Sequence, residues 1–242
     1  MSNRIAGFDR LPVVIGEGNK LAVYVAKKVV AGDVDDSLNP LVFAGPSGCG
    51  KTRLLSAIAE GVACGQDGRT LVSLTGRKLF DEYIAALSDS TVENFRQKYV
   101  HADILILDEF EFFAKGKILQ EEVYAIIDSL LRNGKQIVAA TSVPMKELAE
   151  QMCDKLIGRM SSGAVVEIAY PDETMKRRYL QFALNGKGIE LPEAEIEALA
   201  KSDGKSFWDM KGLVGRAIVA TDRDAADAEL EEKLKERREQ RE

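Results

Sequence analysis

The sequence has little of several features that would mark a special class of protein. Its 242 residues include three cysteines, six prolines and one tryptophan. Cys49, Cys64 and Cys153 are odd in number, far apart and without a C-x-x-C pair. This spacing argues against a disulfide framework and against a zinc site, so we expect three reduced thiols.

Long hydrophobic runs are also missing from the sequence. No apolar stretch approaches the ~20 residues that cross a bilayer, and the N-terminus has no secretory h-region. We therefore expect a cytoplasmic protein with no membrane partner. A formal net charge of −6 argues against an indiscriminate nucleic-acid coat protein, although it allows a local basic patch.

The composition is that of a globular protein with a sizeable core, at 45% hydrophobic and 30% charged residues. Short, β-branched apolar runs alternate with stretches of helical periodicity, and these runs are apolar on both faces. That alternation predicts an α/β fold, with a parallel sheet covered by helices on both sides. The expected strands are residues 41–44, 70–74, 104–107, 136–141 and 164–169, and the expected helices between them are 54–63, 79–87, 92–98, 120–131 and 145–159.

Strand patterns stop after residue 169, and only helical patterns follow, near 173–184, 193–201 and 207–220. This shift predicts three parts: an α/β base at 1–168, a small all-α domain at 169–222 and a charged helical tail at 223–242. The tail carries i,i+4 pairs such as Glu229 with Lys233, which fit a solvated helix or a contact with a partner.

The stretch "AGPSGCGKT" at 44–52 satisfies the pattern G-x-x-x-x-G-K-[ST] between a strand and a helix. Its glycines let backbone N–H groups converge on phosphate oxygens, and the positive end of the next helix points to the same place. The pattern assigns Lys51 to the β and γ phosphates of ATP and Thr52 to Mg²⁺. The expected nucleotide-binding residues are Gly45, Pro46, Ser47, Gly48, Cys49, Gly50, Lys51, Thr52 and Arg53.

An acidic pair ends the buried run "ILILDEF". We predict that Asp108 is the Walker-B carboxylate that holds the metal, and that Glu109 polarises the attacking water. The neighbouring strand should carry a polar residue near the γ-phosphate, for which Thr141 and Ser142 are candidates, with capping of the next helix as the alternative. His101, the only histidine, is assigned no chemistry.

With these motifs in place, the chain resembles the P-loop AAA+ ATPases, with a three-layer α/β/α base and an all-α lid. Within that class it resembles the DnaA family of bacterial replication initiators. The resemblance covers most of residues 8–218. It implies that Ile15 lies on the adenine side, that Ser142 is the sensor-1 residue and that Trp208 stands at the sensor-2 position, where the family has arginine. It also implies that Arg159 is an arginine finger acting on a neighbouring subunit, and hence that the chain self-associates.

The resemblance carries further implications for partners. The helical insert at 76–99 resembles the initiator-specific helix pair, which helps to hold single-stranded DNA, and five basic residues there or nearby are candidate phosphate contacts: Lys78, Arg96, Lys98, Lys115 and Lys117. Their alternative role is solubility. The helicase-contacting and duplex-reading domains of the family find no match, so we expect no sequence-specific duplex binding.

Three functional hypotheses remain open. The first is a DnaA-like ATPase with ATP or ADP and Mg²⁺ as cofactors, which acts in DNA replication initiation or its regulation and hydrolyses ATP slowly. The second is a helicase loader or transposition helper of the DnaC type, with a replicative helicase as partner. The third is an Hda-like regulator that holds ADP and docks on the initiator through Arg159.

Overall fold

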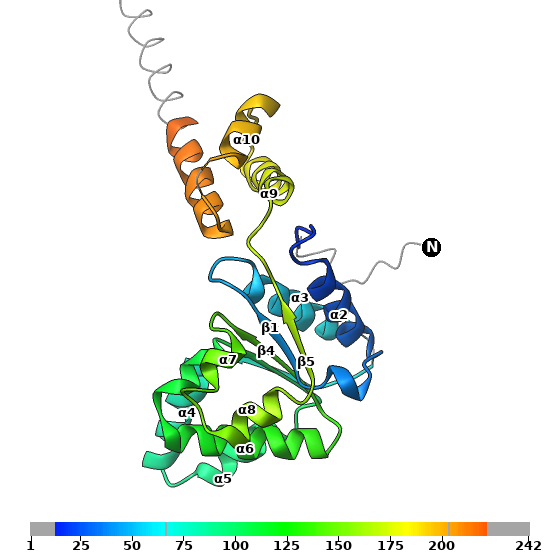
Figure 1. Ribbon diagram of the computed structural model, residues 1–242, viewed down its shortest axis with the longest axis vertical. Helices are drawn as coiled ribbons and strands as arrows, with labels where there is room; N and C mark the ends of the chain where they lie inside the picture. The colour runs from blue at the N-terminus through cyan, green and yellow to red at the C-terminus, as the bar shows by residue number, and fades with distance from the viewer. Residues whose placement is uncertain (1–12, 66, 203, 222–242) are drawn as a thin grey trace, which may run out of the picture. The chain divides into compact units, whose positions relative to one another are not determined.

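The computed structural model describes residues 13–65, 67–202 and 204–221. The chain divides into two compact units, Met1–Tyr170 and Pro171–Glu242 (Figure 1). The tail predicted at 223–242 lies outside the described residues. None of the helices that the structure describes is long and apolar enough to cross a membrane.

The first unit is built on a five-stranded sheet in which every pairing is parallel. The strands are β1 (Leu41–Ala44), β2 (Leu71–Thr75), β3 (Ile104–Asp108), β4 (Gln136–Thr141) and β5 (Ala164–Glu167). Their order across the sheet is β2-β3-β4-β1-β5. All residues of β1 and the first four of β3 are buried, because helices cover both faces of the sheet.

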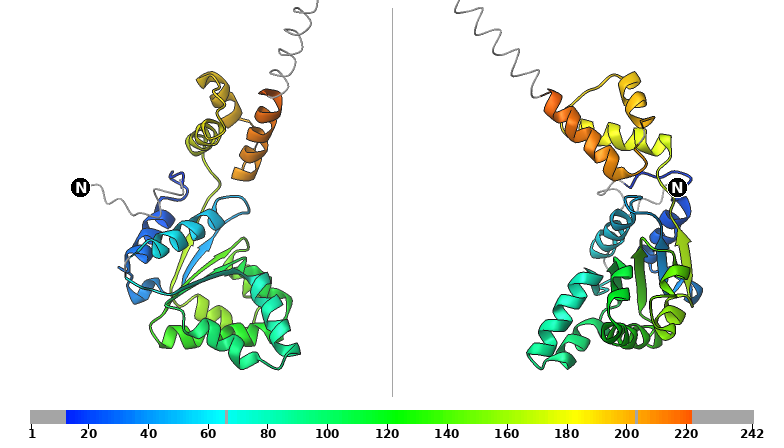
Figure 2. Two further views of the ribbon diagram at one scale, coloured as in Figure 1. Left: turned by 180° about the vertical axis from the view of Figure 1, so that it is seen from behind. Right: turned by 60° about the vertical axis from the view of Figure 1, so that its left-hand side comes forward.

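Helices α2 (Lys20–Ala31) and α3 (Lys51–Ala63) cover one face of the sheet. The other face is covered by α4 (Gly76–Ser88), α5 (Val92–Val100), α6 (Lys117–Arg132) and α8 (Asp154–Met160). Figure 2 shows α4 and α5 on the side of the sheet opposite α2. The predicted three-layer α/β/α arrangement and its parallel sheet are therefore confirmed.

Two parts of the helical prediction differ from the structure. The helix predicted at 145–159 is two helices, α7 (Met145–Leu148) and α8, because the backbone N–H of Cys153 donates to the side chain of Gln120 on α6 (2.7 Å) instead of continuing a helix. Helix α2 was not predicted, although the sequence carries its signal. Apolar residues recur along 22–30 at helical spacing, and Gly32 ends the helix in the left-handed conformation (φ 70°).

The second unit contains α9 (Glu173–Asn185), α10 (Glu193–Ala200) and a helix at 207–221. Asp172 caps α9 by accepting from the N–H of Met175 (2.8 Å). Leu180, Leu184, Ile196 and Met210 are buried in a core of the unit's own, so these helices pack without a sheet.

Candidate nucleotide-binding site

The loop at 45–50 joins β1 to α3 at the carboxyl end of the sheet. Gly48 and Gly50 have positive φ values of 78° and 106°, which favour glycine. A Cβ on Gly45 would lie 2.2 Å from the carbonyl oxygen of Ile168, so this position also has no room for a side chain. The loop is thus a backbone-lined turn that leads into the N-terminus of a 13-residue helix, as phosphate binding requires.

The side chain of Lys51 lies back over this loop. Its Nζ donates to the carbonyl oxygens of Gly45 (2.7 Å) and Pro46 (3.0 Å), and only 7% of the residue is exposed. The ammonium group is therefore held against the loop whose N–H groups would contact a polyphosphate. Cys49 beneath it is buried, and this burial raises the pKa of its thiol, so Cys49 packs as a neutral residue.

Thr52 and Asp108, the two residues predicted to hold the metal, are in direct contact. The Thr52 hydroxyl donates to Oδ2 of Asp108 (2.7 Å), which joins the first turn of α3 to the end of β3. The described part of the chain holds no group of three or more His, Cys, Asp or Glu residues arranged for a metal. A hydroxyl beside one carboxylate fits Mg²⁺, which keeps several waters and takes phosphate oxygens. Thr52 and Asp108 would hold the ion, which would draw charge from the γ-phosphate.

Glu109 adopts a left-handed backbone conformation, with φ 55° and ψ 46°. Such a conformation is rare for a residue with a side chain and costs of order 1 kcal/mol or more. Its N–H donates to Oδ1 of Asp108 (2.9 Å). Its carbonyl oxygen lies against Gly76 at the start of α4, where a Cβ would come within 2.8 Å of that oxygen. Sequence reasoning missed Gly76, because the close approach depends on tertiary packing.

The end of β4 separates the two hydroxyl candidates. Thr141 is fully buried, and its hydroxyl both donates to the carbonyl of Val143 (2.9 Å) and accepts from its N–H (3.1 Å). The Thr141 side chain thus closes its own turn, while its backbone carbonyl supports the P-loop by accepting from the Gly45 N–H (3.2 Å). Ser142, which is half-buried, is left as the candidate for contact with the γ-phosphate or water.

Arg159 lies on α8, and its guanidinium is bound within the same chain. Nε and Nη2 donate to Oδ1 of Asp128 on α6, at 2.8 and 2.6 Å. Sequence reasoning assigned Arg159 to a neighbouring subunit and missed Asp128, because the pair joins two helices 31 residues apart.

The remaining predicted residues lie in both units. Ser47 and Arg53 are exposed on the P-loop and α3, and Ile15 is 39% exposed ahead of α2. Trp208 lies in the second unit and is 67% exposed.

The structure gives two of the five basic candidates other partners. Arg96 donates from Nε and Nη2 to both carboxylate oxygens of the buried Glu122 (2.6 and 2.8 Å), and Lys98 pairs with Glu82 (2.5 Å). A phosphate would therefore have to compete with a carboxylate for Arg96 or Lys98, and the expectation that these two contact phosphates stays a prediction. Lys78, Lys115 and Lys117 are exposed and form no salt bridge with the described residues.

Strand β4 lies between the P-loop strand β1 and the Asp108 strand β3. An intervening strand of this kind, which here carries Ser142 at its end, is typical of AAA+ ATPases, and the fold and site place the chain in that class of P-loop proteins.

Comparison with known proteins gives the family within that class. The family model described as the bacterial DnaA ATPase domain matches residues 3–167, and the chain belongs to this family. The curated chromosomal replication initiator protein DnaA of Chlorobaculum tepidum is 27% identical over 219 residues, which cover 90% of this chain and 44% of that protein. The chain thus spans less than half the length of this curated relative.

Two solved structures are similar along most of the chain. Domain III of the Thermotoga maritima replication initiation protein DnaA is 26% identical with a TM-score of 0.81, and the match covers 88% of both chains. A replication initiator DnaA bound to AMPPCP and single-stranded DNA is 25% identical with a TM-score of 0.75, and the match covers 89% of this chain and 68% of that one.

Proposed function

We propose that the protein is an ATP-dependent switch in DNA replication initiation or its regulation. It binds ATP or ADP with Mg²⁺ at the P-loop, hydrolyses ATP slowly and associates with further copies when ATP is bound. The observation that carries this proposal is the contact between Thr52 and Asp108 beside the buried Lys51, in a chain of the DnaA ATPase family.

In this mechanism each site residue has a separate role in ATP binding or hydrolysis. The P-loop N–H groups and Lys51 hold the phosphates, and Ser142 orients the γ-phosphate. Glu109 accepts a proton from the attacking water. Mg²⁺ held by Thr52 and Asp108 would supply stabilisation of the charge on the transferred group. Arg159 of one copy approaches the nucleotide of the next, which makes association depend on ATP.

The test is association measured by sedimentation velocity with ATP, ADP or no nucleotide. We expect larger species only with ATP. Association should be lost when every copy carries Arg159→Ala, and some ATPase activity should return when Arg159→Ala and Lys51→Ala chains are mixed. Mixing pairs an intact Arg159 with an intact nucleotide site at one interface. The proposal would be contradicted if association were the same with ATP, with ADP and without nucleotide. It would also be contradicted if folded, co-assembling variants recovered no ATPase activity at any mixing ratio.

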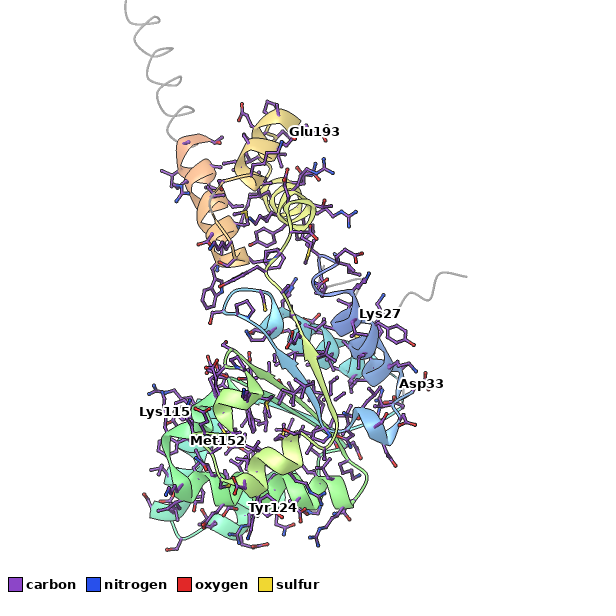
Figure 3. All side chains as sticks on the ribbon, viewed as in Figure 1. Lys27, Asp33, Lys115, Tyr124, Met152 and Glu193 are labelled. Carbon is purple, nitrogen blue, oxygen red and sulfur yellow. The ribbon has the colours of Figure 1, made fainter. Side chains whose placement is uncertain are left out.

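We further propose that the assembled protein contacts single-stranded DNA through Lys78, Lys115 and Lys117, near α4 and the start of α6. Lys115 also lies over the Phe112 ring, with Nζ 4.5 Å from its centroid. Individually weak phosphate contacts add along one strand when several subunits stack. In Figure 3, Lys115 and Lys27 lie on opposite sides of the first unit, which makes Lys27 a suitable control position.

Fluorescence anisotropy with a labelled oligonucleotide tests this contact. We expect single-strand binding that requires ATP, falls steeply with salt and is weakened by Lys78→Glu or Lys115→Glu. Lys27→Glu carries the same change of charge and should bind as the unaltered chain does. An equal loss of single-strand affinity in all three variants would contradict the proposed contact through Lys78 and Lys115. Tight, sequence-selective duplex binding would contradict the proposed absence of duplex recognition.

A second candidate function is favoured by Trp208, which stands where the family has arginine. A lid without that arginine would respond weakly to the γ-phosphate, as suits a regulator that holds ADP and docks on another AAA+ protein through Arg159. Trp208→Arg separates the two functions. If the lid limits ATP hydrolysis by this chain, we expect Trp208→Arg to turn over ATP faster. If the protein holds ADP, we expect no turnover in the unaltered chain or in Trp208→Arg. Capture of a replicative helicase by a Glu109→Gln chain would instead favour a helicase loader.

A further inference from the structure

The carboxylate of Asp128 is shared between two arginines. Its Oδ1 accepts both hydrogen bonds from Arg159, and its Oδ2 forms a salt bridge with Nε of Arg132 (2.8 Å), one turn along α6. The side chain of Asp128 is 14% exposed, whereas that of Arg132 is 71% exposed. Arg159 therefore makes the less exposed of the two pairs, with two charge-assisted bonds to one oxygen.

Helix α8 supports this pair without depending on it. Leu156 and Met160 are fully buried against the core beneath α6, so the backbone at Arg159 is fixed by packing. The side chain of Arg159 is 35% exposed. Because the side chain is partly exposed, it can leave Asp128 by rotation about its own bonds, with α8 in place.

We propose that Asp128 is a positioning residue that holds Arg159 within its own subunit and competes for it with the nucleotide of a neighbouring copy. This inference rests on the proposed action of Arg159 between subunits. Asp128 takes the Nε and Nη2 donors of Arg159. A neighbouring triphosphate that binds the same donors must break the Asp128 pair. The apparent affinity between subunits is reduced by the fraction of chains in which Arg159 is bound to Asp128.

Arg132 tunes this competition. Arg132 and Arg159 pair with the same carboxylate. Loss of Arg132 leaves Arg159 as the one remaining arginine partner of Asp128 and strengthens the pair between Asp128 and Arg159. Loss of the Asp128 charge has the opposite effect, since an asparagine is a weaker acceptor of nearly the same shape. The two substitutions both remove a salt bridge, but they change association in opposite directions.

The experiment measures the protein concentration at half-association with ATP in the full chain. We expect Asp128→Asn to lower this midpoint about fivefold, which corresponds to about 1 kcal/mol, the upper range for a partly exposed ion pair. We expect Arg132→Gln to raise it about twofold. In an Arg159→Ala background, in which association is lost, Asp128→Asn should not restore it. A midpoint that Asp128→Asn leaves unchanged or raises would overturn the proposal, as would changes of the same sign in both variants.

The proposed function and this inference fail in different ways. If the unaltered chain does not associate with ATP, the proposed function is contradicted. The pair is then tested alone by a double-mutant cycle of Asp128→Asn and Arg159→Ala in chemical unfolding. Absence of coupling between the two residues in that cycle would contradict the intrasubunit pair itself.

Discussion

The hydroxyl of Thr52 donates a hydrogen bond to Oδ2 of Asp108 at 2.7 Å, although 56 residues separate the two in the chain. The contact joins the P-loop helix α3 to strand β3. It brings together the hydroxyl oxygen of Thr52 and a carboxylate oxygen of Asp108, and both kinds of oxygen are suited to Mg²⁺.

Thr52→Ala should remove the Mg²⁺-dependent part of ATP affinity. One ligand oxygen is lost, and Oδ2 of Asp108 loses the donor that positions it, so we expect ATP affinity to fall about tenfold with Mg²⁺ and to change little in EDTA. Titration with a fluorescent ATP analogue measures both. Ser56→Ala is the matched control, because Ser56 lies one turn along α3 and donates only to the Thr52 carbonyl. An equal loss with and without Mg²⁺ would remove Thr52 from the metal site.

Lys51→Ala should abolish measurable ATP binding. The ammonium is the single lysine charge of the P-loop and is buried, so an alanine leaves the polyphosphate with backbone donors alone. Isothermal titration calorimetry checks the binding, and circular dichroism checks that the variant is folded. Undiminished ATP affinity in a folded Lys51→Ala chain would overturn the P-loop assignment.

Glu109→Gln should keep ATP binding and slow hydrolysis by about a hundredfold, because the carboxylate acts on water and not on the bound nucleotide. Phosphate release under single-turnover conditions measures the step. Glu111→Gln makes the same change of charge two residues away and should hydrolyse at the rate of the unaltered chain. A parallel loss of binding in Glu109→Gln would indicate a role in metal or nucleotide binding.

The P-loop and the acidic pair could be predicted from the sequence because each is a short local pattern between recognisable elements. The five strands were predictable for a similar reason: short runs such as 104–107 are apolar on both faces, which is typical of strands in a parallel sheet covered by helices. Contacts between distant elements leave no such signal. The division between α7 and α8 depends on Gln120, and the hydrogen bonding of the Arg159 guanidinium depends on Asp128. Local periodicity predicts neither contact.

The insert illustrates the same limit for charge. In the sequence, Arg96 and Lys78 are equivalent basic residues near one helix pair. In the structure, Arg96 forms a bidentate pair with the buried Glu122, whereas Lys78 is exposed. Which positive charges are available for a partner is decided by acidic residues on other elements, and the spacing of the basic residues does not reveal them.

Acid should destabilise the first unit through Asp103. This carboxylate accepts from Lys135 and from the N–H and hydroxyl of Thr70, and these bonds lower its pKa well below the usual value. A lowered folded-state pKa gives stability that is present above the unfolded value, near 4, and is lost as pH falls below it. Because the side chain is about one-third exposed, screening limits the effect to about 1 kcal/mol.

Urea unfolding at pH 7 and at pH 3 measures this loss. Asp103→Asn should be less stable than the unaltered chain at pH 7, and the gap should narrow at pH 3. Asp89→Asn, at the exposed end of α4, controls for the change in net charge. A gap that stays constant with pH would show that Asp103 contributes by shape and not by charge.

Gly76→Ala should lower ATP turnover while ATP binding is kept. The added Cβ would lie 2.8 Å from the Glu109 carbonyl oxygen and 3.0 Å from Cβ of Phe112, and neither atom is the end of a flexible side chain. Either α4 or the backbone at Glu109 must therefore move. Because Glu109 already has a strained left-handed backbone, we expect the displacement to fall on its carboxylate and to cost about tenfold or more in rate.

The control for Gly76→Ala is Gly212→Ala, in the helix at 207–221, where an added Cβ meets no atom within 4 Å. There the helix propensity of alanine should raise stability by up to about 1 kcal/mol and leave turnover unchanged. In Gly76→Ala, turnover should fall at saturating ATP with the nucleotide affinity unaltered, which separates displacement of Glu109 from damage to the P-loop. Full turnover in Gly76→Ala would mean that α4 moves and Glu109 does not, and it would remove Gly76 from the residues that position the catalytic carboxylate.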